Sequence, residues 1–186
     1  SRMDNNRKFE DDVRENIRSL GADESLKMLS HRWICDAARY RYSHNFRWLG
    51  RPIIQFPQDM MALQEIIWDY GPDLIIETGI AHGGSLIFHA SLLELLGHGQ
   101  VLGIDIDIRP HNRVAIEQHP MYKRIEMIEG SSIEPDVVAR VHRHPAATGK
   151  VLLVLDSNHT HDHVLGELAA YSGLIKRGGY IVVMDT

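Results

Sequence analysis

The sequence predicts an α/β protein, a parallel sheet flanked by helices. After Pro72, five short apolar runs alternate with four segments that have helical patterning. Strands that alternate with helices form βαβ crossovers, which place neighbouring strands parallel to one another. The chain has 186 residues, of which 44% are apolar, so one domain of ordinary size can bury a core of this kind.

The elements can be assigned in order along the chain. Residues 9–48 are predicted to be helical, because Leu26, Leu29 and Trp33 recur at three- and four-residue steps. Two prolines make residues 50–57 extended or turn-like, and residues 58–70 form a short helix. We therefore expect a helical extension over residues 1–57 and a ligand-binding domain over residues 58–186. The expected strands are 74–76, 101–104, 125–128, 151–155 and 180–183, and the helices between them are 85–96, 113–119, 134–141 and 163–174.

A glycine-rich loop follows the first expected strand. The apolar run ends at Glu77, and Gly79, Gly83 and Gly84 come directly after it. Glycines at such a turn let the backbone approach a ligand closely. Their spacing is not that of the dinucleotide fingerprint, so it disfavours a nicotinamide-dependent oxidoreductase. Glu77 could meet an amino group of the ligand or hold the loop through its amides, and the sequence leaves both roles open.

Polar residues also follow the other strands, at the sheet edge where α/β proteins bind ligands. Asp105 stands where an acid accepts the ribose hydroxyls of a bound nucleoside, and Asp107 is the weaker candidate. Ser131 and Ser132 are placed to meet the edge of a base, to cap the following helix, or both.

The last two strand ends suggest a cation site. Asp156 and Asp185 occupy matching places on strands that, as neighbours, would lie about 4.8 Å apart. Oxygen ligands suit Mg²⁺ or another divalent cation, and His159 could accept a proton from a hydroxyl nearby. One alternative is a zinc site formed by His159, His161 and His163. Another is that the latter two begin a helix and face solvent.

Composition excludes several classes. The net charge is −5, and no segment concentrates Lys and Arg, so we expect no nucleic-acid partner. No apolar run reaches the length of a membrane span, so we expect no membrane partner. The single cysteine, Cys35, suits a reducing compartment, and the expected location is the cytoplasm.

From about residue 48 onward, the chain resembles the cephalosporin hydroxylase family, whose members resemble S-adenosylmethionine-dependent O-methyltransferases of macrolide and rhamnosyl sugars. The Asp-x-x-His element at Asp156 and His159 is its most specific part. The matching segments are residues 55–59, 77–85, 103–107, 130–131, 156–159 and 178–185.

This resemblance implies a Rossmann-like class I methyltransferase fold that uses S-adenosylmethionine and acts on a hydroxyl of a carbohydrate or glycosylated metabolite. The nucleotide-binding segments would bind the donor. Asp156 and Asp185 would bind the cation, and His159 would act as the base. Many relatives carry Glu-Asp at the last strand, where this chain has Met184 and Asp185, so one charged ligand is replaced. The donor residues implied are Glu77, Gly79, His82, Gly83, Gly84, Ser85, Asp105, Ser131 and Ser132.

The end of the chain raises a further expectation. A methyltransferase sheet has seven strands, and this sequence stops after the fifth, which would leave an apolar edge. We expect either missing C-terminal strands or a partner chain, such as a second copy in a homo-oligomer. The chain could instead be a non-catalytic scaffold with the donor fold. An iron-dependent hydroxylase is also conceivable, although the parallel α/β pattern disfavours it.

Overall fold

The computed structural model describes residues 2–185, with side chains from residue 6 onward. The chain divides after Tyr42 into two compact units. Within the described residues, no helix combines the length and apolar composition needed to cross a membrane.

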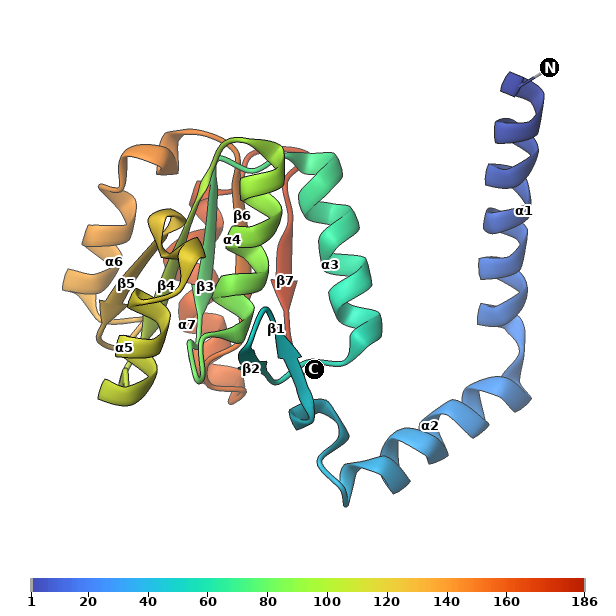
Figure 1. Cartoon of the computed structure of the whole chain (residues 1–186), viewed down its shortest axis with the longest axis horizontal. Coiled ribbons are helices and arrows are strands. Elements are labelled where there is room, and N and C mark those ends of the chain that lie inside the picture. The colour runs from blue at the N-terminus through green and yellow to red at the C-terminus, as the bar shows by residue number, and fades with distance from the viewer. Residues whose placement is uncertain (1, 186) are drawn as a thin grey trace. The chain divides into compact units, whose positions relative to one another are not determined.

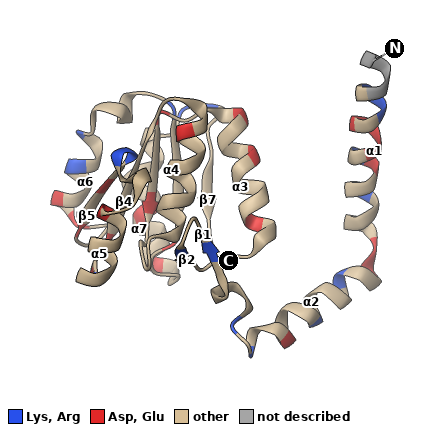
Figure 2. Cartoon of the chain, viewed as in Figure 1, with Lys and Arg blue, Asp and Glu red and all other residues tan. Residues whose placement is uncertain are grey.

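The N-terminal unit consists of two helices, α1 (Arg2–Ala22) and α2 (Glu24–Ala38). Asp23 caps α2 by accepting a hydrogen bond from the Leu26 amide at 2.9 Å. Acidic and basic side chains are interspersed along α1 (Figure 2), and Arg18 pairs with Glu15 one turn away. The predicted apolar stripe lies on α2, but none of the described residues of this helix is buried.

A β-hairpin opens the second unit. Strands β1 (Phe46–Trp48) and β2 (Arg51–Ile53) pair antiparallel, so the predicted helix does not continue to residue 48. Leu49 and Gly50 form the two-residue turn with φ of 45° and 89°, which the right-handed twist of a hairpin favours. Leucine rarely adopts this conformation, which is why sequence patterning offers little sign of the turn. The hairpin folds with the sheet, so the compact unit begins earlier than the boundary expected after residue 57.

The five-stranded sheet is parallel throughout and has the strand order β5-β4-β3-β6-β7. All five predicted strands are confirmed, with ends that differ by up to two residues. The strands are β3 (Leu74–Thr78), β4 (Gln100–Asp105), β5 (Ile125–Glu129), β6 (Val151–Leu155) and β7 (Ile181–Val183). The helices are α3 (Pro57–Tyr70), α4 (Gly84–Leu96), α5 (Pro110–Glu117), α6 (Pro135–His142) and α7 (His161–Tyr171), as Figure 1 shows.

Helices cover both faces of the sheet. On one face, Ile67 of α3, Leu93 of α4 and Ile116 of α5 pack in one buried cluster with strand residues such as Ile75. On the other face, Val141 of α6 and Tyr171 of α7 belong to a second cluster with Ile76 and Leu153. Strands β3 and β6 are buried along their whole length, as expected for the centre of a parallel sheet.

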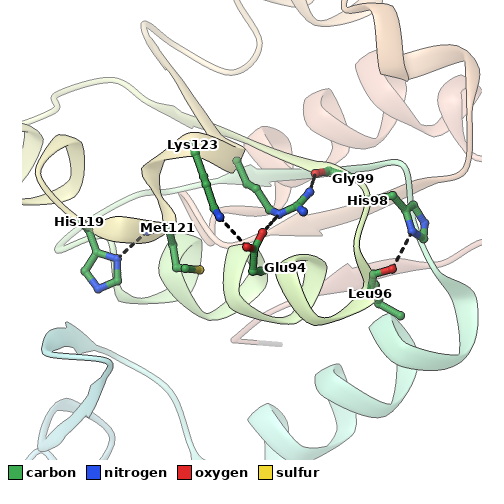
Figure 3. A network of polar contacts seen from close by, with 8 residues as sticks. Glu94, Leu96, His98, Gly99, His119, Met121 and Lys123 are labelled. Atoms are coloured by element: carbon green, nitrogen blue, oxygen red, sulfur yellow. Dashed lines mark hydrogen bonds and ion pairs between the residues drawn. The ribbon is translucent and has the colours of Figure 1, made fainter.

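A polar network ties the C-terminal part of α4 to the short helix η2 (Pro120–Arg124). Glu94 accepts hydrogen bonds from Lys123 and Arg124, and Arg124 also donates to the Gly99 carbonyl at 2.9 Å (Figure 3). The hydrogen bonds from Lys123 and Arg124 lower the pKa of Glu94. This network joins α4 to the segment that directly precedes β5.

Candidate active site

The central feature of the sheet is the switch point between β3 and β6. These strands are neighbours, but β4 and β5 lie beyond β3, whereas β7 lies beyond β6. Ligands of open α/β sheets bind outside the carboxyl ends of the strands at such a point. The loop after β3 and the loop after β6 meet here: a Cβ built on Gly79 would lie 2.0 Å from the main-chain oxygen of Asp156.

The glycines of the loop are required by the protein itself. Gly79 and Gly83 have φ of 93° and 81°, and Ala81 also has a positive φ, 46°. A Cβ on Gly83 would lie 2.3 Å from the Ile116 side chain, and one on Gly84 would lie 2.1 Å from the Pro52 carbonyl oxygen. Close approach between protein segments therefore accounts for the absence of a side chain at these two positions, and their predicted contact with a ligand stays a prediction.

Asp105 holds the loop from the end of β4. Its Oδ2 accepts hydrogen bonds from the amides of Ile80 at 2.8 Å and Ala81 at 3.2 Å, and its Oδ1 accepts from the Asp107 amide at 3.1 Å. The carboxylate thus fixes the backbone that follows Gly79. The predicted ribose contact remains a prediction. Asp105 also lines the cavity described below, so both roles are geometrically open to it.

Two further residues, Arg51 and Asn112, hold the carbonyl groups of the same loop, and no sequence motif pointed to them. Arg51 of β2 donates to the His82 carbonyl through Nε at 3.0 Å and Nη2 at 2.6 Å. Its Nη2 also reaches Oδ1 of the buried Asn112 at 3.0 Å, and Asn112 Nδ2 donates to the Ala81 carbonyl at 3.0 Å. These contacts join segments 31 to 61 residues apart, and no local pattern signals them.

A first cavity of about 160 Å³, the carboxylate cavity, lies over the loop. The predicted residues Gly79, His82, Gly84 and Ser85 line it, together with Asp156, His159 and Asp185. The hairpin and the residues after it supply another part of the wall, residues 52–55. The structure therefore brings the predicted loop residues and the predicted cation residues to one cavity.

The two aspartates and His159 form a compact group. One ligand atom of each lies within 4.8 Å of the others, and His159 Nε2 is 3.4 Å from Asp185 Oδ2. Gln55 Nε2 donates to Asp156 Oδ2 at 3.1 Å, which orients that carboxylate. Met184 belongs to the apolar core packing and supplies no oxygen ligand from its side chain. The two carboxylates are suited to a divalent cation, and the His159 imidazole lies beside them.

The electrostatics of the group also favour a cation. Burial raises the pKa of Asp156 to about 8, and the negative charges of Glu77 and Asp185 act in the same direction, whereas the Gln55 hydrogen bond opposes them. A bound divalent cation would offset this accumulation of negative charge.

A second cavity of about 130 Å³, the serine cavity, adjoins the first at Gly79. Asp105, Ser131, Ser132 and His163 line it, along with residues 157–158 after β6. The predicted residues at the ends of β4 and β5 thus share one cavity. Glu77 lies apart, buried, where Ser85 Oγ donates to it at 2.8 Å and His89 Nε2 lies 3.4 Å away.

The three histidines of the zinc alternative do not converge. His159 lies with the two aspartates, whereas His163 Nε2 is 3.3 Å from Glu167 Oε1. The His161 side chain is 85% exposed and that of His163 only 18%, so the solvent-facing interpretation holds for His161 but is wrong for His163.

Comparison with known proteins connects this geometry to a family. The family model described as "Rhamnosyl O-methyltransferase/CmcI" matches residues 40–186. The rhamnosyl O-methyltransferase of Mycobacterium leprae (strain TN) is 30% identical over 141 residues, which cover 75% of this chain and 59% of that protein. The rhamnosyl O-methyltransferase of Mycobacterium bovis (strain BCG / Pasteur 1173P2) is 32% identical over 133 residues, covering 69% and 51%. The chain thus spans about half the length of these relatives.

Solved structures share the fold. The Mg-SAM form of CmcI superimposes with a TM-score of 0.58 at 20% identity, covering 77% of this chain and 58% of that one. MycE methyltransferase from the mycinamycin biosynthetic pathway, in complex with Mg and SAH, gives 0.55 at 22% identity, covering 80% and 35%. The Rossmann-like methyltransferase fold expected from the sequence is confirmed.

Proposed function

Because the chain belongs to the rhamnosyl O-methyltransferase/CmcI family, we propose that it forms the donor-binding part of an S-adenosylmethionine-dependent O-methyltransferase. Its acceptor is a hydroxyl of a carbohydrate or of a metabolite that carries a sugar. The observation that carries this proposal is the group formed by Asp156, His159 and Asp185, which borders the glycine loop at the switch point of the sheet.

The donor would occupy the two adjoining cavities. Its nucleoside fits the serine cavity, where Asp105, Ser131 and Ser132 offer oxygen atoms to ribose hydroxyls and to the base. Its methionine portion would extend past Gly79 into the carboxylate cavity. The reactive methyl group would thereby be brought towards His159 and the two aspartates. Holding donor and acceptor in one orientation supplies much of the rate in such a transfer, because the sulfonium is already activated.

On the acceptor side, Asp156 and Asp185 would hold a divalent cation, with Mg²⁺ suited to their oxygens. When bound, such a cation lowers the pKa of a hydroxyl that it coordinates. His159 would take the proton from the acceptor hydroxyl as the oxygen attacks the methyl carbon and the bond from carbon to sulfur breaks. Asp185, 3.4 Å from His159 Nε2, stabilises the imidazolium that results.

Calorimetric titration with S-adenosylhomocysteine tests the donor assignment. The chain in EDTA should bind this ligand without added metal and should not bind NADH. Binding of NADH in place of S-adenosylhomocysteine would support an oxidoreductase instead. Methyl transfer from labelled S-adenosylmethionine to alkyl rhamnosides, followed by mass spectrometry, tests the acceptor class.

A further inference from the structure

A buried carboxylate lies behind the serine cavity. Glu167 of α7 is 0% exposed, and its Oε1 accepts hydrogen bonds from Ser132 Oγ at 2.6 Å and Ser157 Oγ at 2.7 Å. His163 Nε2 lies 3.3 Å from the same oxygen. Glu167 itself is not among the residues that line the cavity, but all three of its partners are.

The network joins the loops that form the cavity wall. Ser132 follows β5, Ser157 follows β6, and both are tied to α7 through Glu167. The Tyr171 hydroxyl, also on α7, donates to the Ser132 main-chain carbonyl. The Ser132 side chain therefore has little freedom to turn, and Ser132 as a whole is only 5% exposed.

The direction of these hydrogen bonds determines what the wall offers to a ligand. Each serine hydroxyl has one hydrogen, and in both residues it points inward to Glu167. His163 Nε2 is 3.1 Å from Ser132 Oγ, and since the serine hydrogen is already used, the imidazole is the donor in that contact. Any hydrogen bond between these serine oxygens and a ligand in the cavity must therefore use their lone pairs, so the two serines act as acceptors.

We propose that Glu167 is a positioning residue that selects the base of the donor nucleoside by making Ser132 and Ser157 hydrogen-bond acceptors. The inference rests on the proposed function, since it assumes that a nucleoside occupies the serine cavity. An acceptor wall suits adenine, whose exocyclic amine donates hydrogen bonds. It disfavours hypoxanthine, which has a carbonyl oxygen in that place and would face the serine lone pairs.

The test compares two ligands, S-adenosylhomocysteine and its deaminated analogue S-inosylhomocysteine, by calorimetry on the full chain. The wild-type protein should bind the adenosyl compound roughly 10–100-fold more tightly, the range expected when a buried polar group loses its partner. Glu167→Leu frees both hydroxyls to turn their hydrogens towards the cavity, so this preference should fall at least about fivefold. Ser132→Ala and Ser157→Ala should each lower it as well, and they keep the test available if Glu167→Leu does not fold.

The ratio of the two affinities separates a positioning role from a general structural role. A loosened fold would weaken the binding of both ligands by the same factor and leave the ratio unchanged. His161→Ala, on the same helix with an exposed side chain, is the matched control and should keep the wild-type ratio. A wild-type protein that binds both ligands equally well, or variants that keep the preference, would overturn the inference. A wild-type protein that binds neither ligand would overturn the proposed function, and the inference with it.

Discussion

The main-chain oxygen of Asp156 occupies the space that a side chain on Gly79 would need. A Cβ at Gly79 would lie 2.0 Å from that oxygen, and Gly79 also has a φ of 93°. The glycine loop and the strand end that carries the candidate cation site are therefore in direct backbone contact. A change at Gly79 must move both.

Gly79→Ala should therefore lower the free energy of unfolding by about 2–4 kcal/mol, from a steric clash with backbone atoms and a strained φ. Gly97→Ala is the matched control. Gly97 has a similar φ, 81°, but nothing lies within 4 Å of its built Cβ, so that substitution should cost only about 1 kcal/mol. Urea denaturation of both variants measures the difference. Equal losses would show that the contact with Asp156 contributes nothing.

Asp156→Asn should stabilise the metal-free protein at high pH. Folding raises the pKa of Asp156 from 3.8 to about 8, so the folded state binds the proton more tightly than the unfolded state does. The stability that this proton contributes is complete below pH 4 and is lost as the pH rises through about 8. The variant lacks this loss. At pH 8.5 in EDTA its free energy of unfolding should therefore exceed that of the wild type by about 1–3 kcal/mol, since partial solvent access weakens the effect of the buried charge.

Urea titrations at pH 4.5 and 8.5 check this, and the two proteins should differ little at the lower pH. Asp162→Asn is the control, because the Asp162 side chain is fully exposed. With excess Mg²⁺ at pH 8.5, the wild type should instead be more stable than Asp156→Asn, since the cation binds the ionised carboxylate. A wild-type stability that does not change between the two pH values would contradict the raised pKa of Asp156.

Sequence reasoning succeeded where the signal is local. Apolar runs such as Val151–Leu155 predicted the strands, and because parallel strands end at one edge, the strand ends correctly placed Asp105, Asp156 and Asp185 at the same edge of the sheet. The binding roles of these three residues stay predictions. It failed where tertiary contact decides. The hairpin turn at Leu49 lacks the usual residues for its φ, and no local pattern reveals the contacts of Arg51 with the glycine loop. His163 and Glu167 stand at the i, i+4 spacing of a helical ion pair, but burial gives the pair its role.

Replacing His159 should affect turnover far more than donor binding. In an assay with an acceptor that the wild-type protein methylates, His159→Ala should lower turnover roughly 10²–10⁴-fold, as expected for loss of a general base, while the dissociation constant for S-adenosylhomocysteine stays within about twofold. His161→Ala should change neither quantity, because its side chain is exposed and lies outside the group that contains His159. Comparable losses in the two variants, with zinc found by elemental analysis, would restore the zinc alternative.

Arg51 should govern the shape of the glycine loop and hence the affinity for the donor. Its guanidinium makes three hydrogen bonds, two to the His82 carbonyl and one to Asn112, whose own amide holds the Ala81 carbonyl. Arg51→Lys keeps the charge but cannot reproduce this planar set of donors. We expect it to raise the dissociation constant for S-adenosylhomocysteine about tenfold, as expected for loss of one or two hydrogen bonds.

Asn112→Ala should weaken donor binding to a similar extent. The affinity of the double variant should fall by less than the product of the two single effects, because both residues act on one segment of backbone. Arg47→Ala is the control, since Arg47 belongs to the same hairpin and its side chain is exposed. Calorimetry on the four variants gives the coupling directly. Fully multiplicative effects of Arg51→Lys and Asn112→Ala would mean that the two residues do not hold the loop together, and an equal loss in Arg47→Ala would assign the effect to the hairpin as a whole.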